Sequence, residues 1–523
     1  MADQALAAFA LLLGLPFAGA VLAGLLRGRA SDAAALSAAT ATAIAGVAIV
    51  ARHGIAGISV GLGGIPALDR VAGHEVPLFG FTLDPLASVL LLAAVVIGLL
   101  CALYSLEYVG PSNRESPVPA DRRLYWFWLL TFVGSMSGLV LSTTLLQMFV
   151  FWEMTTVCSW ALIGFYDREH GALGAARKAF LMTAGGGLAL FAALLALLAL
   201  THSAGFDAFA RLPGAARGAA AGLAVLLLVG AWAKSGQVPF HTWLPSAMVA
   251  PSPVSAYLHA AAMVNAGVYL VLRLALANAP APPQLAFASL PGAPALPLLP
   301  APPALPPVLA TVVGVMAAVS LVVAVVQFFV QDDLKRLLAL STVSHLALVL
   351  LGASLAMAGS QLAAQGAALH VLAHGVGKSL LFLSVGVLAF GAGTRRISDL
   401  GGVLARAPVA SAGFLVGALT VTGVPPFAGF WSKLLMVSGG VAMGGIGVAV
   451  GALIVAESLV AFGWFLWVGH RVYLGAPSAA AAAMTPPSRL TDAVLLVLMA
   501  LCLGITLAGL PLVSAMRLGG AGG

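Results

Sequence analysis

Residues 226–245 read LLLVGAWAKSGQVPFHTWLP, an apolar run that contains one lysine and two prolines. Lys234 lies inside the run, and Pro239 and Pro245 follow it. A helix needs about 20 apolar residues to cross a bilayer core of about 30 Å. Proline removes a backbone hydrogen bond and bends or breaks such a helix. The stretch therefore predicts a membrane-spanning helix that is broken close to a charged side chain.

A second stretch, residues 420–437, has the same arrangement and reads TVTGVPPFAGFWSKLLMV. Pro425 and Pro426 stand close to Lys433, which lies 199 residues after Lys234. Broken helices at corresponding positions in two halves of a chain are typical of inverted repeats and of their ion sites. We therefore expect two related halves, each with a broken helix beside a lysine.

The composition supports a membrane protein. Of the 523 residues, 61% are apolar and only 8% are charged, whereas a soluble domain has about 25% charged residues. This scarcity of charge excludes a soluble enzyme, a disordered protein and a nucleic-acid binder, although the pI is 9.6. The three cysteines are scattered and form neither a disulfide framework nor a metal-ligand spacing.

Apolar runs of sufficient length predict an all-α, polytopic membrane protein with about fourteen transmembrane helices. The stretches 52–80 and 275–307 are rich in Gly and in Pro, respectively, and are expected to be loops. The fourteen expected spans are 5–26, 34–51, 81–103, 125–141, 144–165, 179–200, 221–240, 253–274, 308–330, 336–356, 366–391, 409–430, 440–470 and 491–514.

The basic residues predict the orientation of the chain. Loops after odd-numbered spans hold 15 Lys and Arg residues, and loops after even-numbered spans, with the C-terminus, hold 6. Cytoplasmic loops carry an excess of such residues. We therefore expect a bacterial-type inner-membrane protein with cytoplasmic odd-numbered loops and both termini outside.

Three lysines and two glutamates lie within apolar stretches: Lys234, Lys378, Lys433, Glu153 and Glu457. An ionisable group at membrane depth costs about 2.5–3.5 kcal/mol or more, and it usually faces a bundle interior and marks an ion path. The alternative is a residue near a span end whose charge reaches the interface. This alternative applies most readily to Lys378 and Glu457.

Glu153 and Lys234 lie on spans that are close in sequence and could face each other across one interface. A lysine that separates from its carboxylate in a medium of low dielectric constant loses its proton more easily. The pair could therefore load and release protons. A purely structural salt bridge is the alternative reading.

The histidines extend this pattern. His370, His374 and Lys378 are spaced at i, i+4 and i+8, which places them on one helix face. His259 and His345 lie in other apolar stretches, and histidine can relay protons near neutral pH. Zinc binding by His370 and His374 is the rival reading, but neither an HExxH glutamate nor an obvious third ligand is present. His345 could equally be a core histidine.

Several long stretches resemble one protein family, in colinear order over about 125–440. The family comprises the antiporter-like subunits of respiratory complex I, Mrp cation/proton antiporters and membrane-bound energy-converting hydrogenases. The segment LDPLASVLLLAAVVIGLLCALYSLEYVG also resembles the large complex I and Mrp subunits. The matching stretches are FWEMTTVCSWALIGF, GAWAKSGQVPFHTWLPSAMVAPSPVSAYLHAAAMVNAGVYLVLR, DDLKRLLALSTVSHLALVLLG, LHVLAHGVGKSLLFL and GVPPFAGFWSKLL.

The resemblance implies a fold of fourteen helices with two inverted five-helix repeats that contain the broken helices. The sequence contains no phosphate loop, nucleotide fingerprint or redox-centre motif, so we expect no cofactor. The expected parts are an N-terminal three-helix segment (1–124), a first repeat (125–273), a Pro/Ala-rich linker (274–307), a second repeat (308–474) and a C-terminal helix and tail (475–523).

The resemblance also implies roles for the residues of the first half and the centre. Glu153 and Lys234 would form the carboxylate–lysine pair of the first half-channel, and His259 would lie on the connecting span. The central relay would be formed by three side chains of one further span, His370, His374 and Lys378.

In the second half, the resemblance implies that Lys433 is the exit-side lysine on the broken helix. Lysine at this position favours the large-subunit type. The family assigns no role to Glu457, and we expect it to be a partner of Lys433 because both lie in the second half. Asn265 stands where Mrp large subunits often carry lysine, which weakens an Mrp-specific assignment and a sodium claim.

The leading hypothesis is a proton-translocating subunit of a larger membrane complex, driven by partner subunits because the chain has no redox-centre motif. One alternative is an Mrp-type Na+/H+ antiporter subunit. Another is an energy-coupling subunit of a complex for CO2 or bicarbonate uptake. The sequence ends soon after the last expected span. We therefore expect neither a lateral helix nor a fused C-terminal domain, which keeps a hydrogenase-type or carbon-uptake module open.

Overall fold

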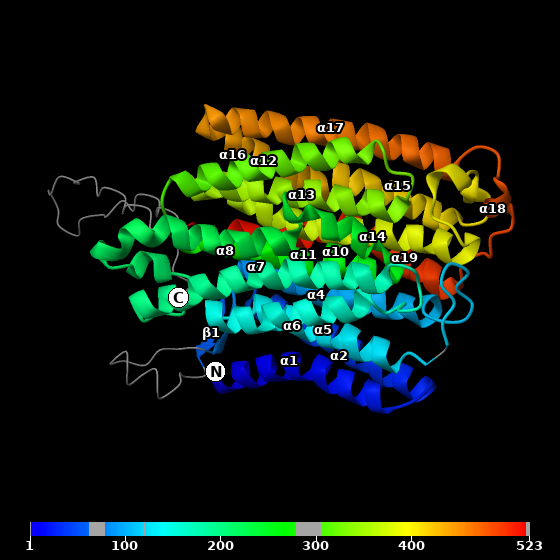
Figure 1. Cartoon of the computed structure of the whole chain (residues 1–523), viewed down its shortest axis with the longest axis horizontal. Helices are drawn as coiled ribbons and strands as arrows, with labels where there is room; N and C mark the ends of the chain where they lie inside the picture. The colour runs from blue at the N-terminus through cyan, green and yellow to red at the C-terminus, as the bar shows by residue number, and fades with distance from the viewer. Residues whose placement is uncertain (1, 62–78, 120, 279–304, 519–523) are drawn as a thin grey trace.

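A computed structural model describes residues 2–61, 79–119, 121–278 and 305–518. Its long helices lie side by side along one axis, which is horizontal in Figure 1. The helices are α1(Ala2–Leu25), α2(Arg29–His53), α4(Pro85–Tyr108), α5(Arg123–Val140), α6(Leu145–Ile163), α7(Ala172–Thr201), η1(Ala208–Arg211), η2(Gly214–Ala219), α8(Ala220–Ser235), η3(Phe240–Thr242), α9(Trp243–Ser246), η4(Ala247–Val249), α10(Ser252–Ala260), α11(Met263–Asn278), α12(Val308–Phe328), α13(Leu334–Met357), α14(Gln361–Ala392), η5(Ile397–Asp399), η6(Val403–Ala405), α15(Pro408–Thr422), α16(Ala428–Met443), α17(Ile446–Tyr473), α18(Ala479–Ala482) and α19(Arg489–Ala515).

The expected all-α polytopic fold is confirmed. Within the described ranges, twelve helices are long and apolar enough to cross a membrane. Two further expected spans correspond to α5, which has 18 residues, and to the interrupted pair α15 and α16. Helices α13 and α14 form the centre of the bundle, because the most apolar window of each is 100% buried.

Polar residues fix where several helices begin. A side-chain oxygen that accepts from a free backbone N–H stabilises a helix start by about 1 kcal/mol. Five long helices begin directly after such a residue, and these residues are Asp84, Thr144, Asp333, Ser360 and Ser488.

The boundaries expected for the twelfth and thirteenth spans are wrong. The span expected at 409–430 ends at Thr422, and α16 occupies part of the expected loop and part of the next span. Gly423, Gly444 and Gly445 have φ of 86°, 69° and 49°. Gly423 adopts the left-handed conformation that ends α15, and Gly444 and Gly445 separate α16 from α17 with positive φ values that suit glycine. The chain therefore makes three helices from two apolar runs.

Two other spans also differ from the expectation. The span expected at 81–103 begins as a strand, because β2(Gly80–Leu83) pairs antiparallel with β1(Ile58–Gly61) before α4 starts. The span expected at 253–274 is interrupted between α10 and α11. At this interruption, the Asn265 Nδ2 donates to the Ala260 carbonyl at 2.7 Å. That bond satisfies a carbonyl in the bundle interior, where an unpaired polar group is costly.

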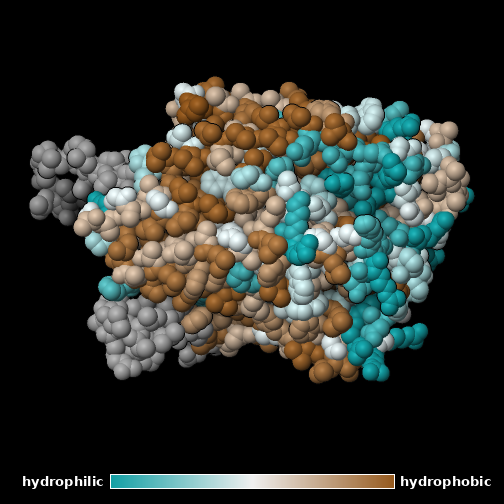
Figure 2. Space-filling model, in the orientation of Figure 1, coloured by the Kyte–Doolittle hydropathy of each residue, from teal (hydrophilic) through white to brown (hydrophobic). Residues whose placement is uncertain are grey.

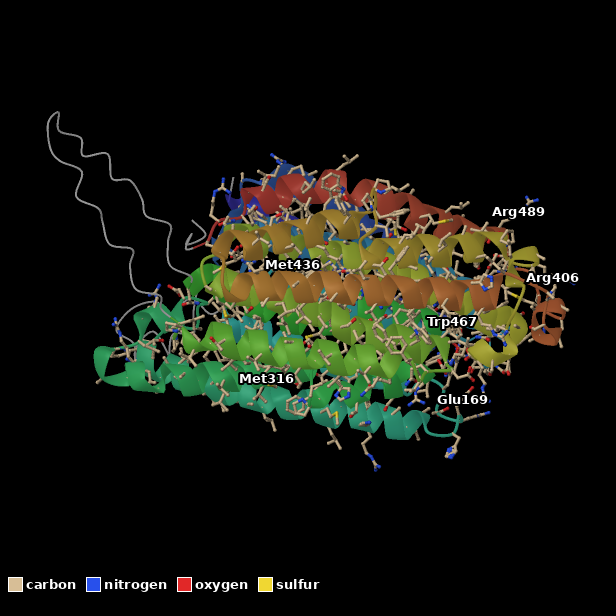
Figure 3. The ribbon with its side chains drawn as sticks, turned by 90° about the horizontal axis from the view of Figure 1, so that it is seen from above. Glu169, Met316, Arg406, Met436, Trp467 and Arg489 are labelled. Atoms are coloured by element: carbon tan, nitrogen blue, oxygen red, sulfur yellow. The ribbon has the colours of Figure 1, made fainter. Side chains whose placement is uncertain are left out.

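The odd-numbered loops gather at one end of the bundle. Figure 3 shows Glu169, Arg406 and Arg489, which belong to three of these connections, at the same end. Figure 2 shows hydrophilic surface towards this end and apolar surface over much of the rest of the visible face. The opposite end carries the start of α1 and the end of α19 (Figure 1). We refer to the end that carries the odd-numbered connections as the basic end.

Two basic residues at or beside the ends of expected spans are buried. Arg273 forms a salt bridge with Asp84, and Lys335 lies in the first turn of α13 with no exposed surface. Helix α11 continues to Asn278, so the linker expected at 274–307 starts later than expected. Most of that linker, and most of the loop expected at 52–80, lie outside the described residues.

Candidate functional site

Both expected helix breaks are present, and they share a local cause. Helix α8 is followed by Gly236 with φ of 60°, and α15 is followed by Gly423 with φ of 86°. Pro239 and Pro425 come shortly afterwards and cannot continue a helix. Pro245 lies within α9, a single turn, rather than at the break itself. Lys234 precedes the first break, at the end of α8, and Lys433 follows the second break, in the second turn of α16.

Lys234 is fully buried in the last turn of α8. Its ammonium donates to the Trp152 carbonyl at 2.8 Å and to the Thr156 hydroxyl at 2.6 Å. It also lies 5.1 Å from the centroid of the Trp152 ring, within the range of a cation–π interaction. Neutral acceptors on α6 therefore hold the charge, and no hydrogen bond or salt bridge joins Lys234 to Glu153.

Glu153 lies on the same turn of α6 as these acceptors and is half-buried. Its Oε1 atom is buried and has no hydrogen-bond partner. The carboxylate occupies the space above Gly187 of α7, where a Cβ atom would lie 2.1 Å from Oε1. The structure thus brings Glu153 and Lys234 to neighbouring positions without an ion pair, and glycine at 187 makes room for the carboxylate.

Replacing Gly187 with alanine is expected to move the Glu153 carboxylate rather than to unfold the chain, because that carboxylate is the end of a flexible side chain. Proton-linked activity should fall if Glu153 acts in ion transfer. Gly185→Ala is the matched control, since a Cβ there meets nothing within 4 Å. It should leave activity unchanged and stabilise α7 by about 0.5–1 kcal/mol. Thermal unfolding and vesicle acidification measure the two effects, and equal activity in both variants would count against a role for the position of Glu153.

The second half contains a direct ion pair. The Lys433 Nζ lies 3.4 Å from Glu457 Oε2, across the contact between α16 and α17. It also donates to the Ser458 hydroxyl at 2.7 Å and to the Thr422 carbonyl at 3.2 Å. Glu457 is 2% exposed, and its other oxygen accepts from Ser344 at 3.1 Å.

Histidines continue this contact series into the centre. Glu457 Oε1 lies 4.0 Å from His345 Nε2, and His345 Nδ1 lies 3.3 Å from His370 Nε2. His370 Nδ1 in turn lies 2.8 Å from the Ser432 hydroxyl, next to Lys433. Four titratable side chains from α13, α14, α16 and α17 therefore lie in a row inside the bundle, and in this row His345 Nε2 has no hydrogen-bond partner.

The remaining predicted residues lie around this series. Lys378 is fully buried and donates to Ser341 and to the Leu338 carbonyl. His374 has no hydrogen-bond partner on either ring nitrogen, although its ring lies 5.8 Å from that of His345. A buried nitrogen without a partner is unusual and suits a site that holds water or a transferred proton.

His259 also has two unpartnered ring nitrogens and no exposed surface. Its ring stacks between Phe382 and Trp243, with centroid distances of 5.4 and 6.4 Å. Trp243 belongs to the segment that follows the first helix break, and Phe382 belongs to α14. His259 therefore lies between the first break and the helix that carries Lys378.

Two lysines that lie directly before expected spans hold the segment after the first break. Lys335 donates to the Ala250 carbonyl at 2.5 Å. Lys178 donates to the Thr242 carbonyl at 3.0 Å and to the Ser246 hydroxyl at 3.2 Å. Lysines near span ends usually reach the interface, and the sequence gives no signal that these two turn inward instead.

A cavity of about 380 Å³ opens beside Lys433, between α15, α16 and α17. Most of its lining is apolar, and the polar exceptions are Thr422, Lys433 and Ser458. The lysine side chain is 8% exposed. The cavity at the second break therefore reaches the lysine of the ion pair.

This architecture, with buried charges at two helix breaks, is that of an antiporter-like membrane subunit. The family profile described as "NADH:quinone oxidoreductase/Mrp antiporter, TM" matches residues 142–290 and 296–461. These residues make up more than half of the chain. The chain belongs to this family, and the resemblance seen in the sequence is confirmed.

Named relatives come from both branches of the family. A protein of Rhizobium meliloti (strain 1021), named as part of a probable K(+)/H(+) antiporter, is 37% identical over 357 residues, covering 68% of this chain and 32% of that protein. NADH-quinone oxidoreductase subunit L of Mycobacterium tuberculosis (strain CDC 1551 / Oshkosh) is 33% identical over 470 residues, covering 86% of this chain and 67% of that protein. The chain thus spans about a third to two thirds of the length of these relatives.

A solved structure is similar over almost the whole chain. In the Mrp complex from Dietzia sp. DQ12-45-1b, one chain superposes with a TM-score of 0.77 and 29% identity. The match covers 97% of this chain and 51% of that one. Both the bundle of long helices and its family are thereby supported by an independent structure.

Proposed function

We propose that this protein is a proton-translocating subunit of a multi-subunit membrane complex. The observation that carries the proposal is the contact series from Lys433 through Glu457 and His345 to His370, buried in the bundle and anchored at the second helix break. Ionisable groups at membrane depth are costly, and they usually mark an ion pathway. Residues 125–273 and 308–474 would form the two inverted repeats, each supplying one half-channel.

Each half would handle the proton differently. In the first half, Lys234 has only neutral acceptors, so a proton on it is held by hydrogen bonds and by the Trp152 ring. In the second half, Glu457 neutralises Lys433. Movement of Glu153 towards Lys234 would stabilise its ammonium, and movement away would favour release of the proton. His259, His374 and Lys378 would carry protons between the halves.

The energy for this cycle would come from partner subunits, since the proposed pathway only conducts protons. Both named relatives are subunits by name, which supports a similar place in an assembly for this chain. A cation/proton antiporter module is the second candidate, because the Rhizobium relative is named for a probable K(+)/H(+) antiporter. Sodium or potassium would then be the cation that is exchanged for protons.

Reconstitution of the complex from its native membrane tests the proposal. We expect acidification or alkalinisation of proteoliposomes, read by a pH-sensitive dye, in a buffer that contains choline as the only monovalent cation. A signal that requires added Na+ or K+ would support the antiporter candidate instead. Proteoliposomes that show no proton movement with any cation would contradict both.

We also propose that the basic end faces the cytoplasm of a bacterial-type cell, with both termini outside. The excess of basic residues at that end supports this orientation. Cysteine placed at exposed Arg168 should react with a membrane-impermeant maleimide only after the cells are opened. Cysteine at exposed Arg211, on an even-numbered connection, should react in intact cells. The reverse pattern would show that the orientation is inverted.

A further inference from the structure

An apolar groove of about 480 Å³ runs between α15 and α17 towards the basic end. Phe414 and Leu415 of α15 form one wall, and Phe465 and Leu466 of α17 form the other. Gly469 also lines the groove, and a Cβ at this position would be in van der Waals contact with the Phe414 ring, at 3.7 Å. An apolar groove of this volume suits a hydrocarbon chain.

One side chain that lines the groove carries a buried hydroxyl without a hydrogen-bond partner. The Tyr473 side chain lines the groove and is 3% exposed, and its hydroxyl makes no hydrogen bond. A buried hydroxyl without a partner costs about 1–3 kcal/mol of desolvation, so such groups are nearly always satisfied. An acceptor oxygen from a bound molecule in the groove would satisfy it.

The charge around the groove is positive. Exposed Arg471 directly follows the lining residue His470 in sequence. Arg406 is also exposed and lies two residues after Leu404, another lining residue, at the basic end (Figure 3). Basic pockets between transmembrane helices at the cytoplasmic side suit anionic lipid head groups.

The groove opens on a face that is suited to contact the bilayer. Helix α17 is 28% buried in its most apolar window. Its exposed side chains include Val455, Leu459 and Trp467, and Figure 3 shows Trp467 on this helix. Lipid from the surrounding membrane can therefore reach the groove directly.

We propose that this groove binds one anionic phospholipid of the bilayer. An acyl chain lies along Phe414, Phe465 and Gly469, an ester oxygen accepts from the Tyr473 hydroxyl, and the phosphate lies by Arg406 and Arg471. The binding claim does not depend on the proposed transport activity, because it concerns a different surface of the chain.

The site has a consequence for the central lysine, which rests on the proposed function. The Phe465 ring forms a wall of the groove, and the Lys378 ammonium lies 5.8 Å from its centroid. A lipid chain packed against this ring would restrict its motion beside Lys378. Occupancy of the groove would thus support proton transfer through the centre.

Native mass spectrometry of the purified full-length chain tests the binding. Phosphatidylglycerol and phosphatidylcholine are titrated separately, and we expect one tightly bound phosphatidylglycerol. Arg406→Gln with Arg471→Gln should weaken it by about 25-fold, given the usual contribution of two basic residues. Arg168→Gln with Arg489→Gln removes the same charge elsewhere at the basic end and should have little effect.

A second pair of variants tests the hydrocarbon part. Gly469→Leu should fill the groove and abolish binding, whereas Gly463→Leu on the same helix should not, because a Cβ at 463 meets nothing within 4 Å. Three results would overturn the proposal: equal affinity for both lipids, phosphatidylglycerol that remains bound to Gly469→Leu, or inorganic phosphate alone that binds as tightly. So would a cross-link from Gly469→Cys to a helix of another protein in the intact complex, with no lipid retained.

Discussion

Replacement of Lys234 with methionine is expected to reduce proton translocation by about 100-fold or more, the usual contribution of a positioned proton-transfer group. The chain should still fold. Methionine keeps the apolar stem, and the Trp152 carbonyl retains the Thr155 and Thr156 hydroxyls as donors. Replacing a buried charge by an apolar group of similar size is often neutral for stability. Dye-monitored acidification of proteoliposomes and thermal unfolding measure the two effects.

Arg336→Met is the matched control, because Arg336 is exposed at the basic end and lies outside the buried series. This variant should translocate protons at the rate of the unmodified protein. If Lys234→Met also translocates at that rate, Lys234 is structural and the proposed relay is wrong. If both variants fail to assemble, Lys234→Arg is the variant to test, because it keeps the positive charge and changes the shape of the side chain. Full activity of an assembled Lys234→Arg variant would contradict a need for lysine at this position.

Replacement of Glu457 with glutamine is expected to have the second large effect. The glutamine can still accept from Ser344, but Lys433 loses its counter-charge in the bundle interior. Removing one partner of a buried pair costs about 3 kcal/mol or more, and the bonds from Lys433 to Ser458 and Thr422 limit this loss. We expect a lower melting temperature and strongly reduced proton translocation.

A double-mutant cycle distinguishes pairing from two independent roles. Adding Lys433→Met to Glu457→Gln should recover most of the lost stability, because no unpaired charge remains, while translocation stays low. Ser458→Ala removes only a neutral partner of Lys433 and should have a small effect. Normal translocation in Glu457→Gln together with an inactive Lys433→Met would show that the pairing has no functional role.

Some site residues can be identified from the sequence, because lysine and glutamate within apolar runs stand out against 8% charged residues. The histidines at 370 and 374 are recognisable by their helical spacing. Lys335 is not, because it closely follows Asp332 and Asp333, which indicate a loop. Ser432 and Ser344, which complete the contact series, also escape notice, because serine in a membrane helix usually bonds to its own backbone.

Length, hydropathy and proline act locally, so the amino-acid pattern is enough to specify a polytopic helical membrane protein with two broken helices beside lysines. Which charges meet is settled by the tertiary structure. It joins Lys433 to Glu457 and His345 but leaves Glu153 and Lys234 without a salt bridge. It also interrupts the eighth span at residues 261–262 and turns Lys335 inward. These outcomes depend on packing between helices that are distant in sequence, which local residue patterns do not encode.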